Sequence, residues 1–300
     1  MARSHPPTLL TLAERTLREE CALPRPSRIL VAVSGGGDSQ ALLHVLSRLS
    51  ARLGLELDAH GVDHGLRPEA AEELELARAL AERSGVPFSI SRLRVTPGGN
   101  LMARARAARH AALERAAASV GAELIATAHH ADDRAETVLE RLLRGAGPRG
   151  LAVLPPRAGT LIRPLLRARR TDVQAHLERH RIPHASDPTN FDRRFMRARL
   201  RFEVLPMLES LSPKIVEHLA ALADQLAAPP PPELEDRQGR PLRLGRAQVR
   251  ELRRLLEKRD YGASVALGQN LQIRLDPATG QPEVLDTAGS RGAVKAKKSD

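Results

Sequence analysis

The hydrophobic pattern of the chain changes its period at a run of three glycines, residues 35–37. Residues 29–33 are apolar without interruption, as expected for a strand that is covered on both faces. Beyond the glycines, aliphatic residues recur at helical spacing from 41 to 49, which predicts a helix beginning at Asp38. Because glycine lacks a Cβ atom, the backbone can turn sharply between strand and helix and approach a ligand closely.

Strand-like and helix-like patterns continue to alternate up to about residue 144. They predict further strands at 55–62, 86–93 and 123–128, and helices at 8–20, 69–83, 100–120 and 132–144. Strands and helices that alternate at this spacing form a parallel sheet with helices on both faces. The predicted fold class is therefore α/β, with a doubly wound, Rossmann-like parallel sheet. Ligands of such sheets bind beyond the carboxyl ends of the strands, where residues 34–39, 63–67 and 129–136 fall.

Prolines mark a change of pattern after residue 206. A helix is predicted at 214–227, and the four prolines at 229–232 indicate a semi-rigid linker. Beyond them the sequence predicts a basic helix at 246–259 and short strands at 263–267, 271–275 and 283–285. We therefore divide the chain into an N-terminal domain (1–206), a helical segment with the proline-rich linker (207–232), a small C-terminal α/β module (233–290) and a disordered basic tail (291–300).

Composition narrows the classes of partner. The net charge of +11 points to a polyanion larger than one nucleotide. Aromatic residues make up only 2% of the chain, too few for a binder that stacks single-stranded bases, whereas structured RNA held through its phosphates remains compatible. Cys21 is the only cysteine, which excludes a disulfide framework and a Cys-x-x-Cys metal site. No apolar run has the length of a membrane span and no signal peptide is evident, so we expect a cytoplasmic enzyme with no membrane partner.

Residues 34–39, Ser-Gly-Gly-Gly-Asp-Ser, combine hydroxyl groups, glycines and the amides of a helix start. Together these groups make an anion cradle, and phosphate is its natural ligand. A Walker loop is excluded because no Gly-Lys dipeptide occurs, and a dinucleotide fingerprint because Ser39 stands where a third glycine is required. Asp38 is suited to hold the Mg²⁺ that neutralises pyrophosphate. The rival interpretation is a glycine turn without a ligand.

A second cluster of candidate residues begins the helix predicted at 132–144. Asp132 and Asp133 lie four and three positions before Glu136, so each shares a helix face with it. Like charges at this spacing destabilise an isolated helix, which suggests a cationic ligand. The rival explanation is the general preference of acidic residues for helix N-termini. A metal site is a second rival, although no carboxylate–histidine ligand set of known spacing closes here. Its imidazoles would come from His60, His64, His129 and His130.

These motifs, in their order along the chain, resemble the N-type ATP pyrophosphatases, or PP-loop superfamily, and within it the tRNA(Ile)-lysidine synthase family. The loop at 34–39 matches the SGGxDS pattern, and the helix start at 128–137 matches an HHxDDxxET pattern with Arg134 in place of the usual Gln. The resemblance covers about residues 28–206. The other segments that carry it are 60–67, 105–109, 141–145, 163–166 and 187–190.

The resemblance implies a reaction in two steps. ATP adenylates the C2 carbonyl oxygen of the wobble cytidine in the CAU anticodon of tRNA(Ile), with release of pyrophosphate. The ε-amino group of free L-lysine then attacks C2 and expels AMP, leaving lysidine. The amine must lose a proton before it attacks, and Asp133 and Glu136 are both candidates for the base.

The resemblance also implies roles for individual residues. Ser34, Gly35, Gly36, Gly37, Asp38 and Ser39 are expected to bind ATP, with Asp38 holding Mg²⁺. Asp133 and Glu136 are expected to bind lysine, an ammonium ligand that two carboxylates suit. Arg197 joins Asp38, Asp133 and Glu136 as a candidate catalytic residue. Contacts to tRNA or to phosphate are expected from Arg106, Arg109, Arg193, Arg194 and Arg201.

Several points remain open at this level. The arginines at 193–201 are also explained by a solvated helix face. The chain departs from the family pattern at Ala198, where Asn is usual, and at His110, where Tyr is common. An amidating ligase, a tRNA-thiolating enzyme and a non-catalytic RNA-binding module are the alternative functions, although thiolation generally needs a cysteine pair. The oligomeric state is undecided, with a homodimer as one option.

Overall fold

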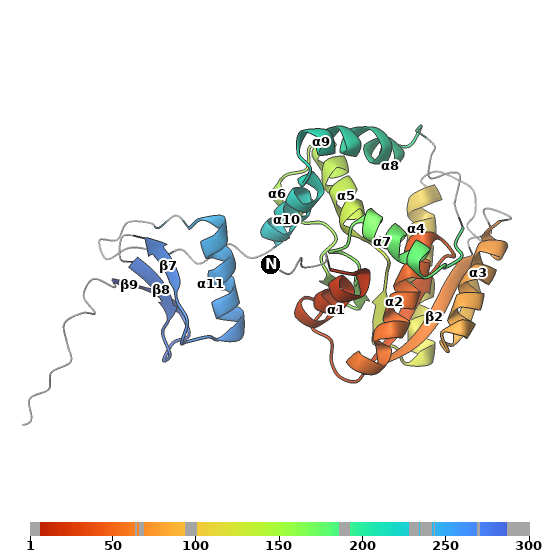
Figure 1. Ribbon diagram of the computed structural model, residues 1–300, viewed down its shortest axis with the longest axis horizontal. Coiled ribbons are helices and arrows are strands. Elements are labelled where there is room, and N and C mark those ends of the chain that lie inside the picture. The colour runs from red at the N-terminus through yellow and green to blue at the C-terminus, as the bar shows by residue number, and fades with distance from the viewer. Residues whose placement is uncertain are drawn as a thin grey trace, which may run out of the picture. The chain divides into compact units, whose positions relative to one another are not determined.

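The computed structural model describes residues 7–63, 65, 69–93, 101–185, 193–227, 234, 242, 244–268 and 271–286 (Figure 1). The chain divides into two compact units, Met1–Ala228 and Pro229–Asp300. Several expectations lie outside the described residues. These are His64 and residues 66–67 of the motif at 60–67, the start of the helix predicted at residue 100, the motif at 187–190, the prolines at 229–232 and the tail at 291–300.

The first unit is built on a six-stranded sheet in the order β3-β2-β1-β4-β6-β5. All neighbouring pairs are parallel except β5 with β6, which is antiparallel. The predicted α/β fold with a mostly parallel sheet is therefore confirmed, whereas the short hairpin of β5 and β6 was not predicted. Two residues in each strand are too few to show a period. The strands are β1 (Ser27–Val33), β2 (Leu55–Asp63), β3 (Phe88–Arg92), β4 (Leu124–Ala126), β5 (Arg157–Ala158) and β6 (Leu161–Ile162).

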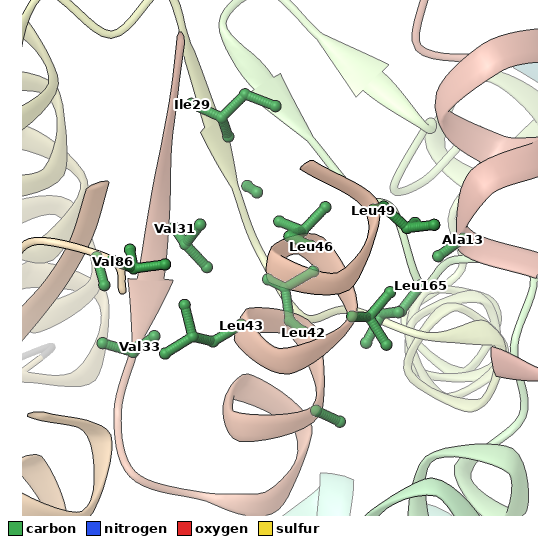
Figure 2. Packing of buried hydrophobic residues seen from close by; sticks show 14 of the residues in the cluster. Ala13, Ile29, Val31, Val33, Leu42, Leu43, Leu46, Leu49, Val86 and Leu165 are labelled. Carbon is green, nitrogen blue, oxygen red and sulfur yellow. The ribbon is translucent and has the colours of Figure 1, made fainter. Parts of the chain in front are cut away.

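Helices cover both faces of this sheet because alternate side chains of the central strand β1 point to opposite sides. Ile29, Val31 and Val33 belong to the core on one face, where they meet leucines of α2 (Figure 2). Leu30 belongs to the other face, where α4 contributes Leu113. The first face is covered by α1 (Leu9–Glu19), α2 (Gly37–Leu53), α3 (Ala70–Arg83) and α7 (Arg170–Arg179), and the second by α4 (Leu101–Val120).

A second, smaller core of the first unit forms where α5 (Ala131–Leu143) packs against helices from the end of the unit. Residues 207–227, which were predicted to lie outside the N-terminal domain, supply α10 and most of α9. Val138 of α5 and Val216 of α10 are fully buried in this core. The other elements here are α6 (Pro148–Leu151), α8 (Met196–Arg199), the π-helical turn η2 (Leu200–Val204), α9 (Leu205–Leu211) and α10 (Ile215–Ala227).

The second unit has a core of its own. Helix α11 (Arg246–Lys258) packs Leu252 and Leu255 against Ile273, on the middle strand of an antiparallel sheet. The strands are β7 (Val265–Gly268), β8 (Leu271–Leu275) and β9 (Pro282–Asp286), in that order. The predicted basic helix and three strands are therefore present, with bounds shifted by a few residues. Across the part of the chain that the structure describes, no helix is long and apolar enough to cross a membrane.

Candidate active site

The glycine-rich loop is held between two other parts of the first unit. Gly35 has a φ of +80°, and a Cβ atom there would lie 1.9 Å from the carbonyl oxygen of Glu73 in α3. Its own carbonyl oxygen accepts a hydrogen bond of 3.0 Å from the amide of Ala185. Both the backbone conformation and the close approach therefore require glycine at this position. The loop is fixed in shape before any ligand arrives.

The two serines of the loop have different roles. Ser39 is buried, and its Oγ donates to the Gly36 carbonyl at 2.9 Å while it accepts from the Ser34 amide at 3.1 Å. Its hydroxyl therefore closes the loop on itself, whereas the Ser34 side chain is exposed. Gly36 is the N-cap of α2 and supplies no side-chain acceptor, so the positive end of the helix is left for an anion.

His130 joins this loop to the acidic start of α5. The ring is fully buried, and its Nε2 lies 3.6 Å from Asp38 Oδ2 and 3.4 Å from Asp133 Oδ2, while Nδ1 lies 3.5 Å from Asp132 Oδ2. Burial alone would lower the pKa of His130, but the carboxylates, Asp133 foremost, outweigh it and raise the pKa to about 9. His130 is therefore an imidazolium at neutral pH. The two motifs found separately in the sequence share this one side chain.

The neighbouring His129 has the opposite character. Burial, reinforced by Arg163, Arg106 and Arg197, lowers the pKa of His129 to about 4, although Asp133 acts in the other direction. Its Nδ1 lies 3.0 Å from Thr127 Oγ1, so the neutral ring is oriented by a local hydrogen bond. Two adjacent histidines thus carry different charges because only one of them faces three carboxylates.

The acidic pair expected to bind lysine is fully engaged by arginines. Arg197 bridges the two carboxylates, with Nε 2.8 Å from Glu136 Oε2 and an Nη 2.8 Å from Asp133 Oδ1. Arg201 and Arg170 also reach Glu136, through its Oε1 at 2.7 and 3.0 Å. Glu136 is only 1% exposed. Burial opposes ionisation of Asp133, but the charges of His130 and Arg197 lower its pKa to about 2.

Arg134 does not lie beside the acidic pair. Its side chain is fully buried, and it donates from Nε to the Val153 carbonyl at 3.0 Å and from an Nη to Asp224 Oδ1 of α10 at 2.6 Å. Asp224 also accepts from Arg167 at 2.6 Å. The Arg that replaces the family's usual Gln therefore ties α5 to α10. Proximity in sequence to Asp133 gave no indication of this, because the helix turns the two side chains to different faces.

The remaining candidate arginines differ in their surroundings. Arg106 and Arg109 are exposed on α4, and Arg193 and Arg194 are exposed before α8. Arg201, by contrast, has a side chain only 18% exposed and is paired with Glu136, so the structure gives it a carboxylate partner where a phosphate was expected. Arg197 is 44% exposed despite its two ion pairs.

The sequence did not reveal the roles of two groups of this site. His130 was considered only as one of four possible imidazole ligands of a metal, and only its three carboxylate neighbours reveal its charge. Arg169 and Arg170 begin α7, and the backbone amide of Arg170 donates to Asp132 Oδ2 at 2.8 Å. The Arg-Arg pair at 169–170, three residues after the matched segment 163–166, was the available signal. Among the described residues His60 belongs to no group of possible metal ligands, and its ring nitrogens lie 2.7 Å from Ser89 Oγ and 3.0 Å from Ser91 Oγ.

Comparison with known proteins defines the class to which this fold and loop belong. A family model described as a PP-loop domain matches residues 9–208, which includes the whole sheet and the helices around the loop. The chain therefore belongs to the PP-loop family. Within it the chain belongs with the tRNA(Ile)-lysidine synthases, because it is 41% identical to a protein of that name over 70% of that protein's length.

The relatives of that name include proteins from Symbiobacterium thermophilum and Thermobifida fusca. The first is 44% identical over 66% of this chain and 43% of its own length. The second is 41% identical over 75% of this chain and 70% of its own length. The chain thus spans less than half of some of the curated relatives that it matches.

A solved structure confirms the architecture only. The U34-tRNA thiolase NcsA from Methanococcus maripaludis, with its [4Fe-4S] cluster, superposes with a TM-score of 0.62 over 73% of this chain and 80% of that one. The two sequences are 19% identical, so the likeness concerns the fold.

Proposed function

We propose that this chain is a tRNA(Ile)-lysidine synthase, which uses ATP to adenylate the wobble cytidine of a CAU anticodon and then attaches lysine there. The observation that carries the proposal is the position of His130, whose buried ring contacts both Asp38 of the glycine-rich loop and Asp133 of the acidic helix. A nucleotide site and an ammonium site that share a side chain suit a reaction that joins an activated base to an amine. The names of the relatives support the same reaction.

The loop suits ATP and the Mg²⁺ that accompanies it. Gly35 and the open start of α2 present amide groups, and Ser34 adds an exposed hydroxyl. The Asp38 side chain is 45% exposed, as required of a carboxylate that shares a cation with phosphate oxygens and water. Mg²⁺ bound there would neutralise the charge of pyrophosphate as it leaves. The imidazolium of His130, 3.6 Å from Asp38 Oδ2, would orient this carboxylate.

Lysine would enter by exchanging places with a guanidinium. Arg197 is the most exposed of the arginines that pair with Asp133 and Glu136, so it can leave at the lowest cost in burial. The incoming ammonium would take over its two carboxylates, of which Glu136 is already oriented by Arg201 and Arg170. The released Arg197 would then be available to a phosphate of ATP or of the tRNA. Asp133 or Glu136 remains the proposed base for the amine.

Exposed arginines provide the proposed surface for tRNA. Four arginine side chains are exposed and can contact phosphates. They are Arg106 and Arg109 on α4 and Arg193 and Arg194 before α8. We propose structured RNA as the polyanion that the charge of +11 indicates. A tRNA-thiolating activity is not favoured, because burial raises the pKa of the single cysteine, Cys21, to about 11.

The test is pyrophosphate release measured with CAU-anticodon tRNA, with and without lysine. Asp133→Asn and Glu136→Gln should raise the KM for lysine at least about ten-fold with little change in the KM for ATP, because each loses a charge-assisted contact to the ammonium. Glu140→Gln is the matched control, since Glu140 lies one turn further along α5 and pairs only with Arg144 among the described contacts. Thermal melting of each variant checks that it is folded.

Two results would contradict the proposal. One is lysine consumption at the normal rate by folded Asp133→Asn protein. The other is equal turnover of ATP when lysine is withheld.

A further inference from the structure

Three histidines meet on the side of the sheet that carries α2 and α7. His176 lies in the last turn of α7, His180 is the C-cap residue directly after this helix, and His44 approaches both from α2. His44 Nδ1 lies 2.9 Å from His176 Nε2, and the three ring centroids are 4.5–5.0 Å apart. One nitrogen from each ring can be chosen so that all three lie within 4.8 Å of one another. The proposed lysidine chemistry uses none of these residues.

The rings of His44 and His176 are uncharged, as coordination to a metal requires. Burial, followed by the proximity of the other histidines and of nearby arginines, lowers the pKa of His44 and of His176 to about 4. Both rings are therefore neutral at pH 7, and each neutral ring has one nitrogen lone pair. The hydrogen bond between His44 Nδ1 and His176 Nε2 uses the lone pair of the acceptor, so a bound metal would replace this hydrogen bond and the donor ring would carry its proton on its other nitrogen. His180 is exposed, so the cluster is open to solvent on that side.

We propose that His44, His176 and His180 bind one transition-metal ion of the Zn²⁺ class. The donor set is made of imidazoles alone, which suit Zn²⁺, Co²⁺ and Ni²⁺ and do not suit the oxygen-preferring Mg²⁺. Tetrahedral coordination at Zn–N distances of about 2.0 Å places the nitrogens about 3.4 Å apart. The facing nitrogens of His44 and His176 are already 2.9 Å apart. The exposed ring of His180 can rotate to bring its nitrogen, now within 4.8 Å of theirs, to the distance that the metal requires.

A metal in this place would clamp α7 to α2 next to the glycine-rich loop. The chain that follows α7 contacts the loop directly, because the Ala185 amide donates to the Gly35 carbonyl at 3.0 Å. It also accepts, at the Pro183 carbonyl, a hydrogen bond of 3.2 Å from the side chain of Gln40 in α2. Three protein ligands leave a fourth position for water on the exposed side. The metal would thus stabilise the support of the loop.

Cobalt is a suitable probe, because tetrahedral Co²⁺ with nitrogen ligands absorbs visible light. The full-length chain, without an affinity tag and without ATP, is titrated with CoCl₂, and melting temperature is measured with and without excess ZnCl₂. We expect one Co²⁺ per chain, displaced by Zn²⁺, and a rise in melting temperature with Zn²⁺. His180→Ala should weaken Co²⁺ binding at least ten-fold and remove the Zn²⁺ effect on melting. Because His180 is exposed, this variant should fold normally.

The matched control is His218→Ala, which removes an exposed histidine from α10 and should bind Co²⁺ as the unaltered chain does. His176→Ala, at the buried position, should abolish tetrahedral absorption. Equal Co²⁺ binding by His180→Ala and the unaltered chain would overturn the proposal, since any metal would then lie elsewhere, for example at Asp38. Absence of both tetrahedral absorption and a shift in melting temperature would also overturn it and leave a hydrogen-bonded packing contact.

Discussion

At the scale of single residues, His130 is a charged group placed in the interior by its partners. An isolated buried imidazole would be neutral, yet three aspartates lie within 3.4–3.6 Å of its nitrogens. The positive charge of His130 holds the glycine-rich loop, which carries Asp38, beside the start of α5, which carries Asp132 and Asp133. Because these distances exceed those of good hydrogen bonds, the interaction is mainly electrostatic.

The charge on His130 should make stability depend on pH. Its pKa in the folded chain, about 9, lies above the ordinary value of 6.5. The charge of His130 therefore stabilises the folded chain fully below pH 6.5, and this stabilisation is lost as pH rises through 9. Its contribution to the free energy of unfolding is at most about 3 kcal/mol. Urea unfolding of the unaltered chain and of His130→Asn should show a stability difference that shrinks across this interval. A difference that is constant from pH 6 to pH 10 would mean that the ring is neutral throughout.

Arg134 should matter for stability and not for lysine. Arg134→Met removes a fully buried guanidinium and leaves Asp224 with Arg167 alone, at a cost of about 2–3 kcal/mol in the free energy of unfolding. The control, Arg144→Met, breaks an exposed ion pair on the same helix and should cost about 0.5 kcal/mol or less. Urea unfolding measures both. An altered KM for lysine at unchanged stability would place Arg134 near the substrate after all.

At the scale of elements, the glycine-rich loop shows how a turn between strand and helix is made specific by a third element. The loop touches α3 through Gly35 and the segment after α7 through the hydrogen bond of Ala185. Neither contact comes from a neighbour in the sequence. Two elements later in the chain, α3 and the segment after α7, therefore fix the shape of the glycine-rich loop at 34–39.

Gly35→Ala should damage the loop more than backbone strain alone explains. The new methyl group would meet the Glu73 carbonyl at 1.9 Å in addition to the strain of a positive φ, which together cost about 2–4 kcal/mol. Gly54→Ala is the matched control, with a φ of +66° but nothing within 4 Å, and should cost about 1 kcal/mol. Unfolding measurements compare the two, and ATP affinity should fall only in Gly35→Ala. Equal stability losses would show that α3 moves aside freely.

At the scale of the whole molecule, the two compact units have separate hydrophobic cores. The first unit contains the loop, the acidic helix and the arginines of the candidate site. The second contains α11 and a three-stranded sheet, with a core of few residues. Each unit can therefore be expected to fold around its own core.

Removal of residues 229–300 should leave the first unit folded. A chain of residues 1–228 keeps every contact of the candidate site described above. Its melting temperature should therefore differ by no more than about 3 °C from the melting temperature of the first unit in the chain of 300 residues. Its affinity for tRNA should fall, because we propose that the C-terminal module, with its basic helix α11, also contacts tRNA phosphates. Calorimetry and a tRNA-binding assay test the two parts. Loss of a cooperative transition would show that the first unit depends on the second.

The amino-acid sequence was sufficient for features that depend on local pattern. Alternation of strand and helix periods predicted the parallel sheet, and the loop at 34–39 and the helix start at 128–137 carry motifs of neighbouring residues. Short elements such as β5 and β6 escaped prediction because two residues have no period. Local pattern also suggested that Asp133 and Glu136 share a face, as they do.

Only the tertiary structure decided the partners of charged side chains. Arg197 pairs with Asp133, 64 positions away, and Arg134 pairs with Asp224, 90 positions away. The meeting of His44 with His176 likewise depends on the packing of α2 against α7. The physical reason is that a helix or strand forms from the pattern of its own residues, whereas the partner of a buried charge is whichever group the packed core brings within reach.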